Sequence, residues 1–441
     1  MSPEVLRPSA VPLFSGNPVT KPLMRLTPFL LLATFTLEPL SAQAADPHLA
    51  RARRVLRQTP LIDGHNDLPW AIRNDSVARH DVEKYDLRKT TPGHTDLARL
   101  KAGMVGGQFW SVYIPATARD SGYARVQLEQ IDIARQVIAK YPEIEWALTA
   151  DALRASHARG RIGSLLGLEG GHAIENSLGA LRAYYDLGAR YMTLTHSANI
   201  DWADSGTDSV RHGGLTKFGE EVVREMNRLG MLVDLSHVSP ATMSDALNVT
   251  EAPVIFSHSS ARAVTDVPRN VPDSILKRLP QNGGIVMVTF VPGFVSRQVA
   301  EYGSETQRVN ADLRQRFPSD DSARRRELAA WRASHPSPKA TLKDVADHID
   351  HIRRVAGADH VGIGGDFDGI SETVVGLEDV STYPALFAEL SRRGWSEADL
   401  RKLAGENLLR VLKRAETVAA RAKQQRQPST KTIQELDGTR T

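Results

Sequence analysis

The chain has 441 residues, 41% of them hydrophobic and 24% charged, which is enough for one large globular domain or two ordinary ones. Its formal net charge of +3 carries little information, but the basic residues are not concentrated beside aromatic residues and the sequence shows no nucleic-acid-binding module. The absence of cysteine excludes thiol catalysis, disulfides and cysteine-ligated zinc, so any metal must be held by His, Asp and Glu.

Residues 1–45 are predicted to be a signal peptide and leader outside the folded domain. After Met24 come Arg25, an apolar stretch from Leu26 to Leu37 and the small-x-small pattern at 42–44, which is the order of a secretory signal peptide. We therefore expect a true start at Met24, cleavage near Ala44 and export to the periplasm or the exterior. The apolar stretch is too short for a comfortable membrane span, so no stable membrane insertion is expected after cleavage. A disordered leader or a short anchor is the alternative.

Apolar runs of strand type then alternate with helical patterns along the chain. The runs are Leu61–Asp67, Gly106–Pro115, Gly163–Gly171, Ala189–His196, Met231–His237, Pro253–His258, Gly283–Phe290 and His360–Gly369. Continuous apolar strands joined by helices indicate a parallel sheet. Eight such units in about 350 residues predict an α/β fold of the (β/α)8 TIM-barrel type, spanning residues 46–420. A doubly wound open sheet is the structural alternative.

Two stretches break this alternation. Residues 296–340 lie between the seventh and eighth strands, and their helical patterns at 311–317 and 322–334 predict a helical insertion over or beside the barrel mouth. A solvated decoration without a catalytic part is an equally open interpretation. Residues 421–441 are polar and low in apolar content, which predicts a disordered tail.

Ionisable side chains stand where the strands end. His65 and Asp67 are two apart on an extended segment, so their side chains point the same way. The other strand-end residues of this kind are Glu169, His196, His237, His258 and Asp366. Each alone is weak, because a lone buried histidine is more often a hydrogen-bonded core residue. Together they favour the barrel, whose enzymes build their sites on the C-terminal face, and burying so many ionisable groups without a metal would be costly.

The donor set favours two metal ions over one. His65, Asp67, Glu169, His237 and His258 supply three imidazoles and two carboxylates. Because one carboxylate can bridge, five residues can serve two zinc ions roughly 3.5 Å apart. The strand of Glu169 lies between those that carry the two pairs, so Glu169 is the predicted bridge. A hydroxide held between the ions would be a nucleophile at neutral pH.

Other side chains are expected to support this centre. Asp366 can orient the attacking water and move its proton to the leaving group. His196 can donate a hydrogen bond to the oxyanion of a tetrahedral intermediate. Arg269 is placed to bind an anion such as a substrate carboxylate, and a surface salt bridge is its alternative. Asp63 and Asn66 are expected to hold the turn around the first metal pair.

Several motifs resemble those of the membrane dipeptidase (renal dipeptidase) family, peptidase family M19. They are DGHNDLPW, GQFWSVY, GLEGGH, WADS, GMLVDLSH, PVIFSHSSAR, RNVPD, VGIGGDFDG and GENLLRVL, in order over about residues 55 to 415. The resemblance implies a TIM barrel of the metal-dependent hydrolase type with two zinc ions. One ion would be held by His65 and Asp67 and the other by His237 and His258, with Glu169 bridging them.

The same resemblance implies the reaction and the substrate contacts. His196 and Arg269 would bind substrate, Asp366 would assist proton transfer, and Trp70 and Phe294 would line the pocket. The expected activity is hydrolysis of dipeptides, both L-Xaa-L-Xaa and L-Xaa-D-Xaa, by a homodimeric protein.

Two alternatives to this function remain open. An N-acyl amino acid deacylase or another binuclear-metal amidohydrolase could use the same barrel. A non-catalytic binding protein would predict lost ligands, and none is missing. Compared with mammalian relatives, the chain lacks cysteine, contains the insertion 296–340 and has no evident C-terminal anchor signal, which leaves membrane attachment and substrate preference open.

Overall fold

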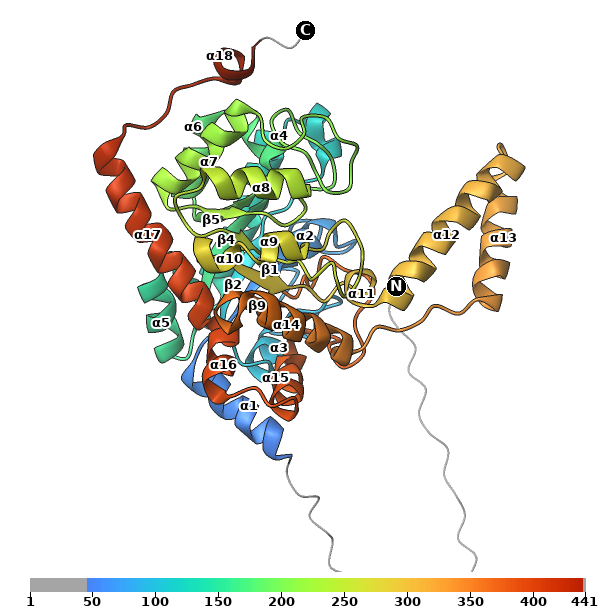
Figure 1. The fold of residues 1–441 in the computed structure, drawn as a ribbon. Helices are drawn as coiled ribbons and strands as arrows, with labels where there is room; N and C mark the ends of the chain where they lie inside the picture. Colours follow the sequence, from blue (N-terminus) through green and yellow to red (C-terminus); the bar gives the residue numbers. More distant parts are fainter. Residues whose placement is uncertain (1–45, 439–441) are drawn as a thin grey trace, which may run out of the picture. The chain divides into compact units, whose positions relative to one another are not determined.

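The computed structural model describes residues 46–438 (Figure 1). The predicted signal peptide and the expected start at Met24 therefore lie outside the described residues. Within the described part of the chain, no helix is both long and apolar enough to cross a membrane.

Parallel strands form a closed barrel. Its members are β1 (Leu61–Asn66), β2 (Val105–Ser111), β4 (Ile162–Glu169), β5 (Ala189–Thr193), β6 (Leu232–Asp234), β7 (Ile255–Phe256), β8 (Ile285–Val288) and β9 (Val361–Ile363). Their order is β2-β1-β9-β8-β7-β6-β5-β4, and the pairing of β2 with β4 closes the ring. This closure confirms the predicted (β/α)8 barrel and excludes the open sheet, which would have two unpaired edges.

A ninth strand, β3 (Ile144–Trp146), was not predicted. It pairs in parallel with the start of β4, where Ile144 lies opposite Ile162. The strand has only three residues and Glu145 is one of them, so it offers no apolar run that the sequence could reveal.

Helices surround the barrel (Figure 1). They are α1 (Pro47–Gln58), α2 (Leu68–Asn74), α3 (Leu97–Ala102), α4 (Tyr123–Lys140), α5 (Ala150–Ala158), α6 (Leu178–Asp186), α7 (Lys217–Leu229), α8 (Pro240–Val249), α9 (Asp273–Leu276), α10 (Leu279–Asn282), α14 (Leu342–Ala356), α15 (Tyr383–Arg392), α16 (Glu397–Arg401) and α17 (Asn407–Gln425). Ser177, Thr216 and Ser239 begin α6, α7 and α8 by accepting a hydrogen bond from the backbone N–H three residues later. Every residue of the eight barrel strands is buried, as expected for parallel strands covered on both faces.

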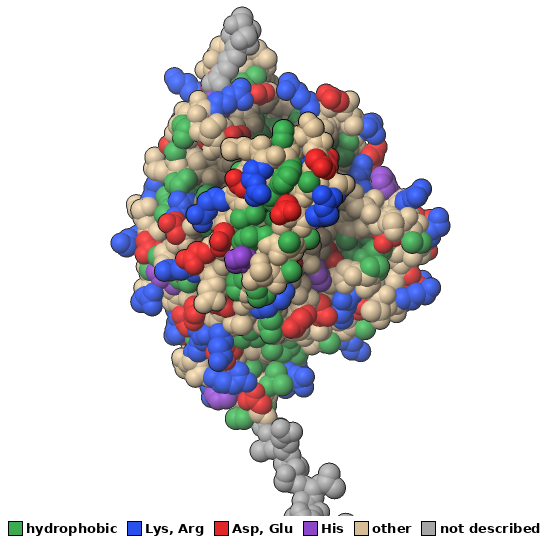
Figure 2. All heavy atoms as spheres, turned by 90° about the vertical axis from the view of Figure 1, so that its right-hand side faces the viewer, with side chains coloured by type: hydrophobic (Ala, Val, Ile, Leu, Met, Phe, Trp, Pro, Cys, Tyr) green, Lys and Arg blue, Asp and Glu red, His purple; other side chains and the backbone are tan. Residues whose placement is uncertain are grey.

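The insertion between β8 and β9 is helical, as predicted. It consists of α12 (Arg297–Arg316) and α13 (Asp321–Ser334), which form a hairpin that projects beside the barrel in Figure 1, and the short helix α11 (Pro292–Val295) precedes it. Within the hairpin, Trp331 stacks on Tyr302 and His335. Helix α12 starts at Arg297, well before the predicted residue 311. The prediction missed its first part because the sequence of α12 is largely polar and only Leu313 is buried, so it shows little apolar periodicity. Figure 2 shows the side of the molecule that lies on the right in Figure 1, and the basic and acidic side chains of the described residues are interspersed on it.

The C-terminal segment differs from the predicted disordered tail. Helix α17 continues to Gln425, beyond the predicted domain end at residue 420, and α18 (Ile433–Asp437) lies against α7. Ile433 and Leu436 pack on the hydrophobic core, and Thr216 Oγ1 donates a hydrogen bond to Asp437 at 2.6 Å. These tertiary contacts give a polar sequence a defined conformation that its composition does not predict.

Candidate active site

The end of β1 is fixed by a buried carboxylate. Asp63 accepts hydrogen bonds from the backbone N–H groups of His65 (3.1 Å) and Gly365 (2.9 Å) and from the hydroxyl of Tyr383. The side chain of Asn66 accepts one from the first turn of α2 at 2.9 Å. Asp63 therefore ties β1 to the loop after β9 and to α15, and Asn66 holds the turn. Through these hydrogen bonds both side chains orient the chain that carries the ligand group.

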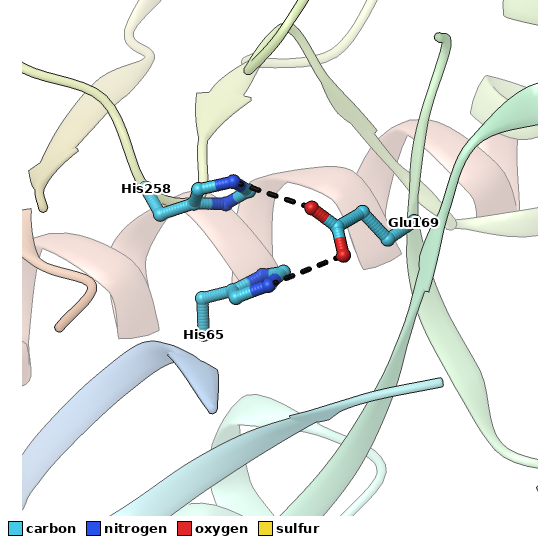
Figure 3. A group of neighbouring side chains, drawn as sticks. All are labelled: His65, Glu169 and His258. Atoms are coloured by element: carbon cyan, nitrogen blue, oxygen red, sulfur yellow. Dashed lines mark ion pairs between the residues drawn. The ribbon is translucent and has the colours of Figure 1, made fainter. Parts of the chain in front are cut away.

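Glu169, the last residue of β4, lies between two groups of ligand-type side chains. Its Oε2 lies 3.5 Å from His65 Nε2, and the same nitrogen lies 3.2 Å from Asp67 Oδ2. Its Oε1 lies 3.0 Å from His237 Nε2 and 3.4 Å from His258 Nε2. Figure 3 shows one carboxylate oxygen directed at His65 and the other at His258. A carboxylate placed between two such groups can in principle be shared by two cations.

Unpartnered polar atoms indicate that the site accommodates cations. Within residues 46–438, Asp67 Oδ1 and His65 Nε2 are buried and form no hydrogen bond of acceptable geometry, although His65 Nε2 lies 3.2 Å from Asp67 Oδ2 and each atom can form one. The Nε2 atoms of His237 and His258 lie only 2.9 Å apart, so both rings direct a nitrogen that can bind a metal toward the same position. Three sets of ligand atoms lie within 4.8 Å of one another: His65, Glu169 and His258; Glu169, His196 and His237; and His65, Asp67 and Asp366. Nitrogen and carboxylate oxygen donors in such sets fit divalent metal ions.

The protonation states suit ligands. Burial lowers the pKa of His258 to about 3 and, together with Arg269, that of His237 well below its usual range, so both imidazoles are neutral as metal ligands must be. Burial alone would raise the pKa of Glu169, but His65 and the other histidines outweigh it and hold that pKa well below its usual range. Conversely, Tyr191, Asp67 and Glu169 overcome burial and raise the pKa of His65. The two carboxylates thus attract positive charge to this position.

Two site residues adopt a strained backbone. His237 has φ 70° and Asp366 has φ 63°, in the left-handed region that non-glycine residues rarely occupy. Gly369 follows closely in the loop after β9, where an added Cβ would lie 2.3 Å from Asp67 Oδ2 and 2.5 Å from Asp366 Oδ1. Only glycine therefore lets this loop approach both carboxylates.

A second layer of side chains orients the histidine rings. Tyr191 OH lies 2.8 Å from His65 Nδ1. Ser257 Oγ lies 2.8 Å from His258 Nδ1 and donates to Asp234 Oδ2 at 2.6 Å. A carboxylate linked through a hydroxyl to the far nitrogen of an imidazole fixes the ring and its tautomer, as supporting residues of metal sites do.

A cavity of about 290 Å³ opens above these residues. It is lined by Asp67, Trp70, Tyr113, Glu169, His196, His237, His258, Arg269, Val291, Phe294, Asp366, Gly369 and Ile370. The structure thus gathers nine predicted site residues around one space, with His65 buried beneath Asp67 and Glu169. Phe294 lies on α11, which precedes the insertion, and no residue of α12 or α13 is among these lining residues.

Tyr113 is a cavity residue that the sequence analysis missed. Its ring meets that of Trp70 edge-on at 4.8 Å and lies 4.7 Å from the ring of His196. It follows Ser111 by two positions at the end of β2, and Ser111 Oγ donates to Glu169 Oε2 at 3.3 Å. Alternation along the extended chain therefore carried a usable signal for Tyr113.

Arg269 is a buried cation on the cavity wall. Only 5% of it is exposed, and within residues 46–438 it forms no ion pair. Its guanidinium donates only weakly to Ser259 Oγ (3.4 Å) and the His258 carbonyl (3.3 Å) and lies 5.2 Å from the Phe294 ring centre. Burial lowers its pKa to about 10. The alternative of a surface salt bridge is therefore wrong, and the position suits an anion entering the cavity.

Comparison with known proteins agrees with this geometry. The family model of the membrane dipeptidases (peptidase family M19) matches residues 49–426. The chain belongs to this family. Dipeptidase 3 of Rattus norvegicus is 43% identical over 380 residues, covering 85% of this chain and 69% of that protein. Dipeptidase 3 of Mus musculus is 42% identical over 380 residues, with coverage of 85% and 68%.

Solved structures of M19 dipeptidases and their relatives share the fold. The probable dipeptidase PvdM from Pseudomonas aeruginosa superposes with a TM-score of 0.72 at 25% identity, covering 84% of this chain and 99% of that one. A metallo peptidase from Rhodobacter sphaeroides, liganded with a phosphinate mimic of the dipeptide L-Ala-D-Ala, superposes with a TM-score of 0.65 at 27% identity, covering 81% and 99%. The predicted resemblance is confirmed: the protein is a metal-dependent hydrolase of the M19 dipeptidase family.

Proposed function

We propose that the protein hydrolyses the peptide bond of L-Xaa-L-Xaa and L-Xaa-D-Xaa dipeptides at a centre of two zinc ions. The observation that carries this proposal is the position of Glu169, with one oxygen toward His65 and the other toward His237 and His258. His65 and Asp67 would hold one ion and His237 and His258 the other, with Glu169 shared.

The protein side chains would act around these ions. When bound, the two ions supply an activated water and polarise the scissile carbonyl. Asp366 would accept the proton of the attacking water and pass it to the leaving amine, and burial raises its pKa well above the usual range for a carboxyl group, which suits a group that must hold a proton. His196, whose Nε2 lies 3.7 Å from Glu169 Oε1, would donate a hydrogen bond to the developing oxyanion.

The wall of the catalytic cavity that carries Arg269 would limit the length of the substrate. Arg269 is a buried guanidinium that pairs with no carboxylate of the described residues, so it would bind the C-terminal carboxylate of the substrate and limit the chain to one residue beyond the scissile bond. Trp70 and Phe294 would contact the substrate side chains. The L-Ala-D-Ala mimic bound by the Rhodobacter sphaeroides relative supports acceptance of a D-residue at the second position.

An N-acyl amino acid deacylase is the second candidate, because Arg269 would bind the carboxylate of an N-acyl amino acid equally well. A panel containing L,L-dipeptides, L,D-dipeptides and the matching N-acetyl amino acids separates the two activities. We expect turnover of both dipeptide classes and little turnover of the acetylated compounds. Preferential hydrolysis of the acetylated compounds would instead identify a deacylase.

Removal of metal should abolish activity. Prolonged treatment of the purified protein with a chelator is expected to eliminate dipeptide hydrolysis, and readdition of zinc should restore it. The measurement is kcat/KM with an L,L- and an L,D-dipeptide, alongside metal content, for the untreated, chelated and reconstituted protein. Full activity of a protein shown to be free of metal would contradict the proposal.

Removing the support of His258 should weaken metal binding without removing a ligand. Ser257→Ala breaks the link from Asp234 to His258 Nδ1, so the affinity for zinc is expected to fall about 10- to 100-fold. Zinc competition against a chromophoric chelator measures the change. Ser304→Ala, on the exposed helix α12, is the control and should bind zinc like the unaltered protein.

We also propose that the protein is exported and forms a homodimer. The signal-peptide pattern around residues 24–44 supports export, and the family resemblance supports the dimer. Cell fractionation with N-terminal sequencing of the mature chain, and light scattering of the purified protein, test the two statements separately.

A further inference from the structure

A second cavity of about 310 Å³ adjoins the catalytic one. His196 lines both, so its ring forms part of the wall between them. The remaining walls come from the segments that follow β2, β4 and β5, and their charged or ring-bearing members are Arg119, Tyr123, His172, Glu175, Asp201 and Arg211. The proposed reaction assigns no role to this space.

The second cavity presents charges of both signs. Arg119 forms no ion pair with any residue between 46 and 438, and Glu175 accepts only a backbone hydrogen bond from Tyr123, at 3.0 Å. Arg211 lies 3.7 Å from Asp201, whose carboxylate also accepts a hydrogen bond from Asn176. One guanidinium and one carboxylate are therefore available to a ligand in addition to this pair.

The base of the cavity is neutral and polar. Burial lowers the pKa of His172 to about 4, so its ring is uncharged, and its Nε2 donates to the Ile114 carbonyl at 3.0 Å. Tyr123 meets this ring edge-on at 4.9 Å. Because these two rings are half-buried and the charged side chains of the cavity are exposed, the charges lie on the solvent side of the rings.

The position of the second cavity indicates which end of a dipeptide would lie next to it. Around the closed barrel, β2, β4 and β5 lie diametrically across from β7, β8 and β9. Arg269 and Phe294 follow β7 and β8. A dipeptide whose C-terminal carboxylate is bound at Arg269, with its scissile bond at Glu169, therefore directs its N-terminal residue across the barrel toward the second cavity.

We propose that this second cavity is the subsite for the side chain of the N-terminal substrate residue. It selects a long side chain that ends in both an ammonium and a carboxylate over an apolar side chain of similar length. Arg119 would bind the carboxylate and Glu175 the ammonium. The proposal rests on the proposed dipeptidase function, because it assumes that the C-terminal carboxylate is held at Arg269.

The test compares four dipeptides that share a C-terminal D-alanine. Their N-terminal residues are norleucine, lysine, 2-aminoadipate and 2,6-diaminopimelate, which present an apolar end, an ammonium, a carboxylate and both charges. For the zinc-loaded full-length protein, kcat/KM for the diaminopimelyl substrate should exceed that for the norleucyl substrate by roughly tenfold or more, with the singly charged substrates between them. Equal values for all four would overturn the subsite, whereas failure to hydrolyse any of them would overturn the dipeptidase function itself.

Two variants test whether Arg119 and Glu175 cause the preference for the doubly charged side chain. Arg119→Met and Glu175→Gln are each expected to reduce the ratio of diaminopimelyl to norleucyl kcat/KM by roughly tenfold, and the ratio within one sample is independent of the fraction of folded enzyme. Arg125→Met, an exposed arginine of α4 that pairs with Glu129, is the control and should keep the ratio of the unaltered protein. An unchanged ratio in both test variants, or an equal loss in the control, would show that this cavity does not select the side chain.

Discussion

Replacement of Glu169 by alanine is expected to remove both metal ions and nearly all dipeptidase activity. Glu169 contacts ligand residues of both proposed metal sites through separate carboxylate oxygens, Oε2 to His65 and Oε1 to His237 and His258. Without it, each proposed metal site keeps only two protein ligands, fewer than the three or four that hold zinc tightly. Because the ions supply several kcal/mol of transition-state stabilisation, kcat/KM should fall about 10³-fold or more.

A ligand that serves one ion gives the matched comparison. His65→Ala should lose the ion shared with Asp67 and keep the one at His237 and His258. Metal content after gel filtration distinguishes the results: about two ions per chain for the unaltered protein, one for His65→Ala and none for Glu169→Ala. His335→Ala, at the exposed end of α13, should keep both ions. Two ions retained by Glu169→Ala would show that this carboxylate is not the bridge.

The convergence of the predicted ligand residues could be inferred from the sequence because of a property of parallel barrels. The carboxyl ends of all strands reach the same face, so residues far apart in the chain converge there once the fold class is known. His65 and His258 lie far apart in the sequence, yet their ring centroids are 3.8 Å apart. The pattern of apolar runs ending in His, Asp or Glu therefore predicted the fold and the face of the barrel on which these side chains meet.

Features that depend on tertiary contacts were not readable in this way. The three-residue strand β3 is stabilised by pairing with the start of β4. The last helix, α18, is stabilised by its contacts with α7 and by the hydrogen bond from Thr216. Tyr113 was missed for a different reason: the prediction considered metal ligands at the strand ends and gave no attention to the aromatic residue beyond Ser111. The burial and the missing ion partner of Arg269 also required the structure, since a loop arginine is more often exposed.

Arg269→Met is expected to lower activity and raise stability at the same time. In the free protein, the guanidinium is buried with two weak hydrogen bonds and, among residues 46–438, no paired carboxylate, which is an unfavourable environment for a charge. The proposed substrate carboxylate would complete the pair. Loss of one partner of a buried charge pair costs 2 kcal/mol or more, so kcat/KM for dipeptides should fall at least about 30-fold.

The stability of the same variant separates substrate binding from a structural role. Because methionine fills a similar volume without burying a charge, the free energy of unfolding should rise by on the order of 1 kcal/mol, measured by urea denaturation of the metal-loaded protein. Arg308→Met, exposed on α12, should change neither activity nor stability. A residue that serves only the fold would show the opposite result, with Arg269→Met losing stability and activity together. Gain of stability with loss of activity is the signature of a cation kept buried for its ligand.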